Sequence, residues 1–209
     1  MKITAAKILI LGGIAGPVLF TLVTIICAAL RPGYNHLYDF ISELGASGTP
    51  NAVLMNSLGF IPGGLMFSLF GLGLLLSGYQ GGKFKAGSVL IIVFGLGVAT
   101  AGIFSCDVGC PINGTTEAVV HDRVSLVAFF SSITAMFLFG SSFKKTTSFH
   151  NLALYSKLSG AFTLLFLVIM ILSYPSETLS GLWQRLMLGT IFLWSGVVAY
   201  RFALNRNLV

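Results

Sequence analysis

Reactive and charged residues gather at one point of a chain that is otherwise apolar. The segment 104–111 holds two cysteines and an aspartate, and His121-Asp122-Arg123 follows shortly after it. Hydrophobic runs flank this region on both sides. Because charged side chains are costly to place at a membrane boundary, this region is the first place to look for a function.

The start of the apolar run at about residue 119 carries a pattern that could support acid–base chemistry. Glu117, His121 and Ser125 are spaced by four residues, so in a helix they share one face. His121 could act as a general base, with Glu117 or Asp122 orienting the imidazole. The alternative is a helix-start cluster in which the acids favour the positive end of the helix dipole and Arg123 reaches a lipid phosphate or an acidic neighbour. The sequence leaves both interpretations open.

Three cysteines are present, and two of them suggest a disulfide. Cys106 and Cys110 are separated by three residues in a segment that we place outside the cell, where the compartment is oxidising. We therefore expect a disulfide that fixes this loop against the bundle. A metal or redox pair is the alternative, but a single C-x-x-x-C is a weak metal pattern and differs from the C-x-x-C redox spacing. Cys27 lies within an apolar run and is expected to be an inert core thiol.

Residues 34–49 predict a short amphipathic helix that lies on the membrane surface or folds over the bundle. One face follows i, i+3, i+4, i+7 spacing and is formed by Leu37, Phe40, Ile41 and Leu44. His36, Asp39 and Glu43 fall on the opposite side. Together with His121 they could form a metal site. The alternative is the solvated face of an amphipathic helix, and the residues specify no cofactor.

The last apolar run opens with Gln184 and Arg185 on the same side as the other polar groups. Arg185 could pair with an acid there or hold a phosphate or carboxylate group. We expect an internal salt bridge, with Asp107, Asp122 or Glu43 as its partner. The candidate binding residues are Glu43, Asp107, Arg123, Gln184 and Arg185.

The composition indicates an integral membrane protein of the all-α class. The chain has 209 residues, of which 56% are hydrophobic and 9% charged, whereas soluble domains carry about 25% charged residues. Its net charge of +6 arises from basic residues at the ends of apolar runs, so no nucleic-acid partner is expected. The runs predict one transmembrane domain over 1–209 with six helices, at about 8–30, 53–77, 86–104, 119–143, 153–174 and 183–203.

Charge distribution predicts the orientation in the membrane. Of the 12 lysines and arginines, all but Arg31, Arg123 and Arg185 fall on the side that also holds both termini. The positive-inside rule therefore places both termini in the cytoplasm. The six acids all fall on the outer side, and they are Asp39, Glu43, Asp107, Glu117, Asp122 and Glu177.

Small residues and a proline mark the first two apolar runs. Gly12 and Gly16, like Gly59 and Gly63, have the four-residue spacing that lets helices approach closely. Pro62 removes a backbone hydrogen bond within the second run, so a kink is expected there.

The order of these features resembles the domain of unknown function 998 family of bacterial and archaeal membrane proteins. The similarity is carried by the segment 40–46 after the first run, by the Phe-x-x-Asp of 104–107, and by His121-Asp122, and it extends over nearly the whole chain. Glu43 stands where an aspartate is more expected. The resemblance implies a six-helix protein of a prokaryotic plasma membrane. It singles out Glu43, Asp107, His121 and Asp122, and it implies no substrate because the activity of the family is not established.

Two functions compete at this stage, and the oligomeric state is open. In the first, the outer rim binds a membrane lipid or another amphiphile through His121, Arg123, Arg185 and the acids, with chemistry on that lipid as an extension. In the second, the protein is a scaffold or partner subunit whose outer charges form a structural network. A small-molecule transporter ranks third, because the spans hold essentially no charges near the membrane midplane.

Overall fold

The computed structural model describes residues 5–112, 114–145, 147–174 and 178–205. Within these ranges the chain is all-helical, without strands, and six of its helices are long and apolar enough to span a membrane. The spans are α1 with α2 (Ala5–Ile10, Gly12–Ala29), α3 with η2 and α4 (Ala52–Leu54, Met55–Phe60, Ile61–Leu75), α5 (Gly82–Ile103), α6 (Thr116–Phe143), α7 (Asn151–Ser173) and α8 (Ser180–Leu204). Two short 3-10 helices, η1 (Ile41–Gly45) and η3 (Thr147–Phe149), lie between spans.

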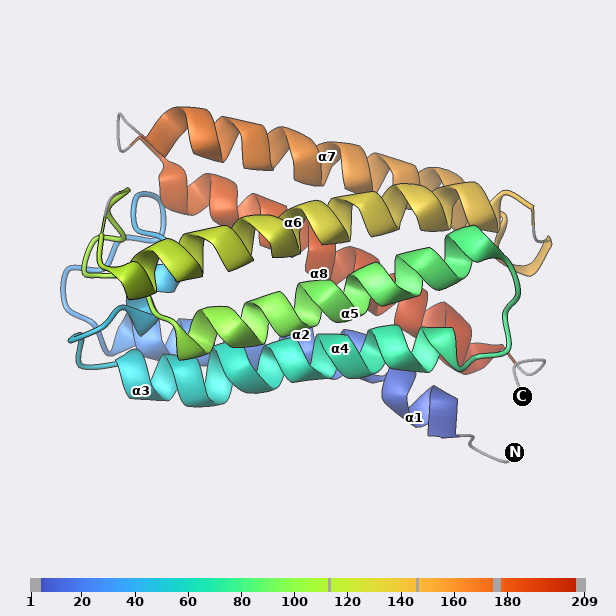
Figure 1. Cartoon of the computed structure of the whole chain (residues 1–209), viewed down its shortest axis with the longest axis horizontal. Helices are drawn as coiled ribbons and strands as arrows, with labels where there is room; N and C mark the ends of the chain where they lie inside the picture. The colour runs from blue at the N-terminus through green and yellow to red at the C-terminus, as the bar shows by residue number, and fades with distance from the viewer. Residues whose placement is uncertain (1–4, 113, 146, 175–177, 206–209) are drawn as a thin grey trace.

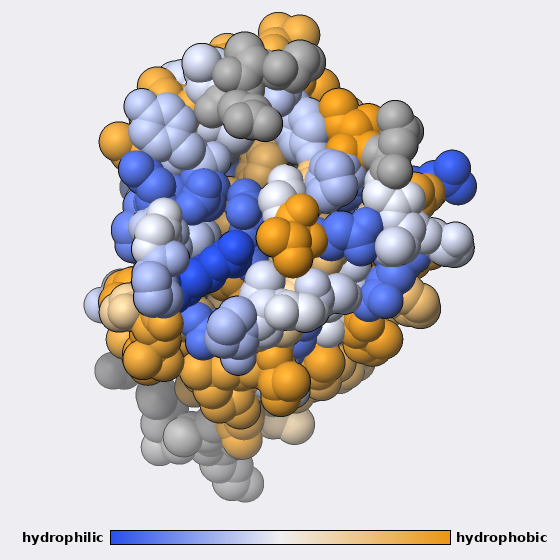
Figure 2. All heavy atoms as spheres, turned by 90° about the vertical axis from the view of Figure 1, so that its left-hand side faces the viewer, coloured by the Kyte–Doolittle hydropathy of each residue, from blue (hydrophilic) through white to orange (hydrophobic). Residues whose placement is uncertain are grey.

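The six spans form a closed ring. From α4 to α8 each helix packs against the next in sequence, and α2 closes the ring between α4 and α8. Figure 1 shows that α1 begins and α8 ends at the same end of the bundle. We call the opposite end the loop end, which carries residues 30–51, 104–112 and 114–115. Figure 2 looks onto the loop end and shows hydrophilic residues gathered on it, while apolar residues cover the flanks.

Small residues bring α2 and α4 close together. A Cβ on Gly12 would overlap the carbonyl oxygen of Met66, and a Cβ on Gly16 would lie 3.2 Å from the carbonyl oxygen of Gly63. The close approach predicted from the spacing of these glycines is therefore present in the structure. Helices in a bilayer associate largely through such packing, because burial from lipid gives no hydrophobic gain.

Pro62 is accommodated by a widened helical turn. Because Pro62 has no N–H, the carbonyl of Leu58 loses its α-helical donor. The chain before it forms the π-helix η2, in which Ile61 N donates to the carbonyl of Asn56. Such turns re-aim the side chains that follow. Here they place Phe60 and Gly63 on the wall of an internal cavity.

A second proline, Pro17, leaves a free carbonyl within α2 that another helix satisfies. Pro17 cannot donate to the carbonyl of Gly13, four residues earlier. The hydroxyl of Ser195, buried on α8, lies 2.9 Å from that carbonyl and 3.0 Å from the Phe192 carbonyl of its own helix, so its hydrogen is shared between them. Neighbouring hydroxyls are the usual means of satisfying such groups inside a membrane.

Ser195→Ala is therefore expected to destabilise the bundle by about 1 kcal/mol, the range of interhelical hydrogen bonds in membranes. The midpoint of thermal unfolding in detergent measures this change. Ser141→Ala is the matched control, since that hydroxyl donates only to a carbonyl of its own helix, at Phe137. Equal stability of both variants would show that the Gly13 carbonyl does not need this donor.

The amphipathic helix expected over 34–49 is replaced by turns and the single 3-10 helix η1. Side chains compete for the backbone donors that a longer helix would use. Asp39 accepts from Asn35 N at 2.7 Å, Asn35 accepts from Leu37 N at 2.9 Å, and Glu43 accepts from Phe40 N at 3.0 Å. Ile41 and Leu44 of η1 are buried, so this helix folds onto the bundle.

Candidate binding site at the loop end

Asp107 organises the start of α6. Its carboxylate accepts hydrogen bonds from the backbone N (2.7 Å) and the hydroxyl (2.9 Å) of Thr115. The Thr115 hydroxyl in turn accepts from Ala118 N at 3.3 Å, which makes Thr115 the N-cap of the helix. As a result α6 begins at Thr116, three residues before the predicted start. Asp107, expected as a binding residue, is used to hold this loop.

His121 is buried and its ring is oriented by the end of α5. Its Nδ1 lies 3.0 Å from the carbonyl oxygen of Ala101 and 2.9 Å from that of Phe104. Both partners only accept, so Nδ1 carries the hydrogen. In the neutral imidazole Nε2 is then an acceptor. Glu117, expected to orient the ring, instead accepts a hydrogen bond from Ser105 N at 2.9 Å.

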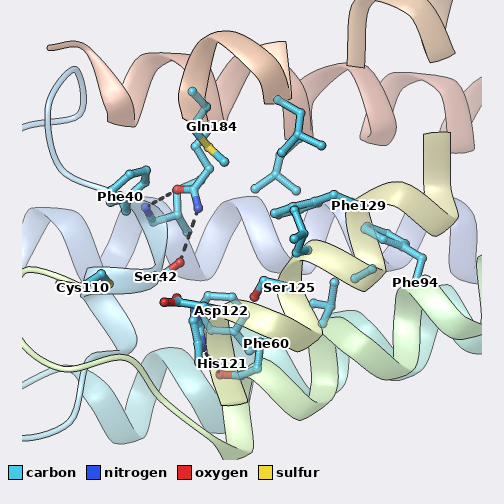
Figure 3. Close-up of a pocket in the computed structure, with 18 of the residues that line it drawn as sticks. Phe40, Ser42, Phe60, Phe94, Cys110, His121, Asp122, Ser125, Phe129 and Gln184 are labelled. Atoms are coloured by element: carbon cyan, nitrogen blue, oxygen red, sulfur yellow. Dashed lines mark hydrogen bonds between the residues drawn. The ribbon is translucent and has the colours of Figure 1, made fainter. Parts of the chain in front are cut away.

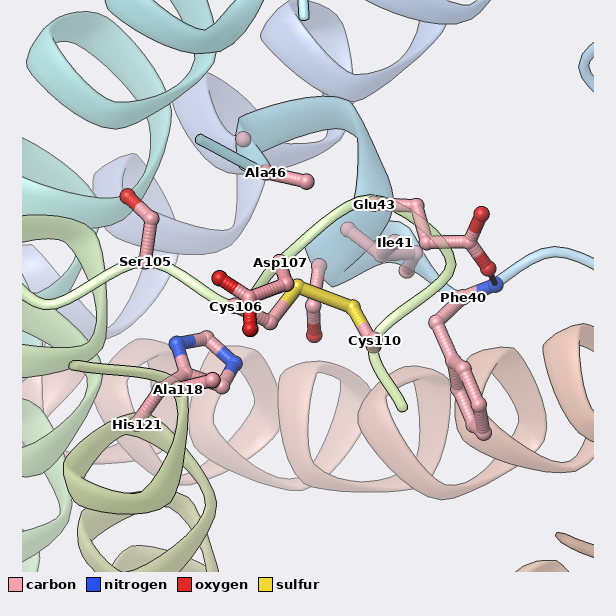
Figure 4. Close-up of a disulfide and its surroundings, with 12 residues drawn as sticks. Phe40, Ile41, Glu43, Ala46, Ser105, Cys106, Asp107, Cys110, Ala118 and His121 are labelled. Atoms are coloured by element: carbon pink, nitrogen blue, oxygen red, sulfur yellow. Dashed lines mark hydrogen bonds between the residues drawn. A yellow bond between two sulfur atoms is a disulfide. The ribbon is translucent and has the colours of Figure 1, made fainter. Parts of the chain in front are cut away.

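Cys106 and Cys110 form the expected disulfide, and both residues are buried (Figure 4). Neighbouring segments bind the backbone of this loop. Ser47 N donates to the carbonyl of Cys106 at 2.9 Å, and the hydroxyl of Tyr174 donates to the carbonyl of Cys110. The Tyr174 ring stacks on Phe40 with centroids 5.4 Å apart. The loop is thus joined to the first connection and to the end of α7. Cys27 is a free buried thiol, as expected.

Removing the disulfide is expected to lower stability by about 2 kcal/mol, the chain-entropy value for so short a loop. A Cys106→Ser, Cys110→Ser double variant should unfold at lower temperature than the wild-type protein, and reductant should no longer shift its midpoint. Cys27→Ala is the control, because it removes the remaining thiol and should preserve the effect of reductant. A wild-type midpoint that is unchanged by reductant would contradict this role.

Three charges at the loop end, Arg31, Glu43 and Arg185, are held by groups of the protein itself. Arg31 lies 4.0 Å from the Glu43 carboxylate and also donates to the Glu43 carbonyl. Burial raises the pKa of Glu43 above its ordinary value. Arg185 donates to the carbonyls of Asp39 (2.9 Å) and Gly181 (2.8 Å). The salt bridge expected for Arg185 is therefore absent from the described residues, and the pair at Glu43 is made by Arg31.

Tyr34 lies between these two arginines. The guanidinium carbons of Arg31 and Arg185 are 5.8 and 5.5 Å from its ring centroid, and Arg185 also donates to its hydroxyl. Burial raises the pKa of Tyr34 to about 12, so the phenol stays neutral. Arg185 therefore fixes the first connection on α8, and Arg31 holds together residues within that connection.

The structure does not bring the proposed metal ligands together. Across the described ranges there is no group of three or more His, Cys, Asp or Glu side chains that could hold a metal ion. Asp39 is bound to the backbone of Asn35, and Glu43 is paired with Arg31. His36 is exposed and lies against the edge of the Tyr34 ring.

A cavity of about 450 Å³ lies inside the ring of helices. All six spans line it. Its polar lining comes from Ser42, His121, Asp122, Ser125 and Gln184. Figure 3 shows Ser42, Asp122 and Ser125 gathered at one end of the cavity, with Phe94 and Phe129 toward the other. The lining includes seven phenylalanines, which are Phe20, Phe40, Phe60, Phe67, Phe94, Phe129 and Phe192.

Gln184 connects the cavity to η1. Its buried amide oxygen accepts from Ile41 N at 2.6 Å, and its amide nitrogen lies 3.4 Å from the hydroxyl of Ser42. The sequence indicated Gln184 as a binding residue, but Ser42 was not singled out, although it lies within the family segment 40–46. Arg123 is exposed and does not line the cavity.

The cavity wall reaches the surface between α6 and α7. Leu126 on α6 and Ile171 on α7 both line the cavity, and they are 42% and 48% exposed. α7 also has the smallest buried share of the six spans. The cavity is thus bounded by residues that would face lipid hydrocarbon. At the loop end its lining includes Phe40, Cys110 and Tyr174, the residues joined through the disulfide loop, and also Ile112, which is 58% exposed.

Comparison with known proteins now assigns the family. A family model described as a protein of unknown function (DUF998) matches residues 14–201. The chain belongs to the DUF998 family. The match spans the segment 40–46, the disulfide loop and the pair His121-Asp122, and the family predicted from the sequence is confirmed. No curated protein and no solved structure matches the chain. This family member is an integral membrane protein that crosses the bilayer several times.

Proposed function

We propose that this protein binds a single-chain amphiphile in the cavity at the loop end. The observation that supports this best is the distribution of its lining residues. Polar groups lie at one end, and Phe94 and Phe129 lie toward the other, which matches a molecule with a head group and a chain. Small-molecule sites have this composition, a mostly apolar wall with a few placed polar groups.

The volume favours one chain over two. About 450 Å³ is room for roughly 15 methylene-sized groups if each takes about 30 Å³, as a water molecule does in the liquid. That is enough for one 12-carbon chain whose head group lies at the polar rim, whereas a lipid with two such chains exceeds this space. The exposed lining residues Leu126 and Ile171 support access from the bilayer, since the ligand would slide between α6 and α7 without crossing the polar loops.

We further propose that the loop end faces away from the cytoplasm, with both termini inside. The positive-inside distribution of lysines and arginines supports this orientation. A disulfide at the loop end also fits an oxidising compartment. The site would then collect amphiphiles from the outer leaflet of a prokaryotic plasma membrane.

Native mass spectrometry in a nonionic detergent tests the proposed binding. Monolaurin, an uncharged single-chain amphiphile, should add to the protein in a one-to-one ratio and should raise its unfolding temperature. A dilauroyl lipid with the same chains should not add with that stoichiometry. If monolaurin shows only graded, non-saturating adducts, or if the two-chain lipid binds as well, a single-chain cavity site would be contradicted.

A further inference from the structure

We infer that the ligand of this cavity carries a protonated amine as its head group. The inference rests on the proposed binding function and adds the chemical class of the head group. Two independent features support it: the charge of the lining residues, and the hydrogen-bonding polarity of the groups at the rim.

The charged lining of the cavity is acidic. Asp122 lines it, and the lining includes no lysine or arginine within the described residues. The arginines of the loop end are placed elsewhere. Arg31 is held by Glu43, Arg185 is held by backbone carbonyls and a phenol, and Arg123 is exposed outside the lining. An anionic head group would therefore meet a carboxylate with no compensating cation, whereas an ammonium group would be paired.

The second feature is that two residues at the polar end of the cavity, His121 and Asp122, present hydrogen-bond acceptors. The hydrogen on Nδ1 of His121 is directed at two carbonyls, so in the neutral imidazole Nε2 presents a lone pair. No hydrogen bond to Nε2 is formed within the described residues, and His121 lines the cavity. The carboxylate of Asp122 accepts only. A head group that donates several hydrogen bonds satisfies both residues, and an ammonium group has three donors.

The partial exposure of Asp122 limits the size of the effect. Asp122 is on the exposed rim, where water weakens an ion pair. We expect the ammonium head group to improve affinity up to about 5-fold over an uncharged head group on the same chain, the upper end for an exposed pair, and a phosphate head group to weaken it. Added salt should reduce the ammonium preference, because the pair is open to counterions.

Displacement of an uncharged fluorescent single-chain probe by dodecylammonium, dodecanol and dodecyl phosphate tests the inference. The wild-type protein should rank them in that order. Asp122→Asn should remove the preference for dodecylammonium while dodecanol still displaces the probe. Glu117→Gln is the matched control, since it removes an acid of the same helix outside the cavity and should leave the ranking unchanged.

The ranking by the wild-type protein decides the matter even if Asp122→Asn fails to fold. Equal displacement by dodecylammonium and dodecanol, or strongest displacement by dodecyl phosphate, would overturn the inference and leave the proposed function standing. Retention of the ammonium preference in a folded Asp122→Asn variant would also overturn it. If the probe does not bind the wild-type protein at all, the proposed function itself fails, and the inference fails with it.

Discussion

Ser125→Trp is expected to abolish amphiphile binding while the bundle remains folded. Ser125 lies on α6 at the polar end of the cavity and is only partly buried, so a larger side chain there points into open space. An indole ring would occupy the volume between the head-group residues and the apolar wall. We expect affinity for monolaurin to fall at least about 100-fold, which corresponds to about 2.7 kcal/mol. Titration followed by native mass spectrometry measures the change.

Val127→Trp is the control for this experiment. Val127 is on the same helix, 57% exposed, and it is not among the cavity-lining residues. The added indole would face lipid, so binding should stay within about twofold of wild type, since nothing in the cavity changes. Wild-type affinity in a folded Ser125→Trp variant would show that the amphiphile binds somewhere other than this cavity.

Gly95→Ala is expected to destabilise the bundle by about 2–3 kcal/mol, at the upper end of the usual cost of overpacking. Gly95 on α5 faces Gly64 on α4, where the two helices pack backbone to backbone. A Cβ on Gly95 would overlap the carbonyl oxygen of Gly64 and the backbone N of Ser68. A Cβ on Gly64 would likewise overlap Gly95 and Ala99. Neither backbone can shift without separating α4 from α5.

Gly196→Ala is the matched substitution on α8. A Cβ at Gly196 would have no atom within 4 Å, so only the helix propensity changes. Alanine is then expected to be neutral or to stabilise by up to about 1 kcal/mol. Thermal unfolding of the two variants in one detergent compares them directly. Similar midpoints would mean that the contact between α4 and α5 tolerates a methyl group and is looser than the structure indicates.

The spans and the disulfide could be predicted from sequence because each depends on local signals. Runs of apolar residues with basic residues at their ends define spans to within a few residues of the helices in the structure. The error at α6 has a physical cause, since Thr115 and Asp107 cap that helix earlier than the apolar pattern begins. Cys106 and Cys110 were close in sequence, so their pairing needed little knowledge of the fold.

The cavity and the partners of the charges could not be predicted in the same way. The cavity is a gap left by side chains from all six spans, and no single segment encodes it. Arg185 was expected to pair with a carboxylate. It instead donates to two backbone carbonyls, which lie close together only in the folded protein. His121 is likewise oriented by the end of α5 and not by Glu117, its neighbour one turn away. The spacing of apolar residues predicts which residues share a helix face, but it does not predict contacts between segments that are distant in the sequence.

Photolabelling tests the central claim most directly. A single-chain amphiphile with a diazirine near the end of its chain would be added to the protein in a nonionic detergent, and the labelled residues identified by mass spectrometry. If the amphiphile binds in the cavity, adducts should form on the apolar wall, at Phe94, Phe129 or Phe192, and should be lost in Ser125→Trp. Adducts confined to exposed residues outside the cavity, such as Leu172 and Leu193, would contradict binding within the bundle.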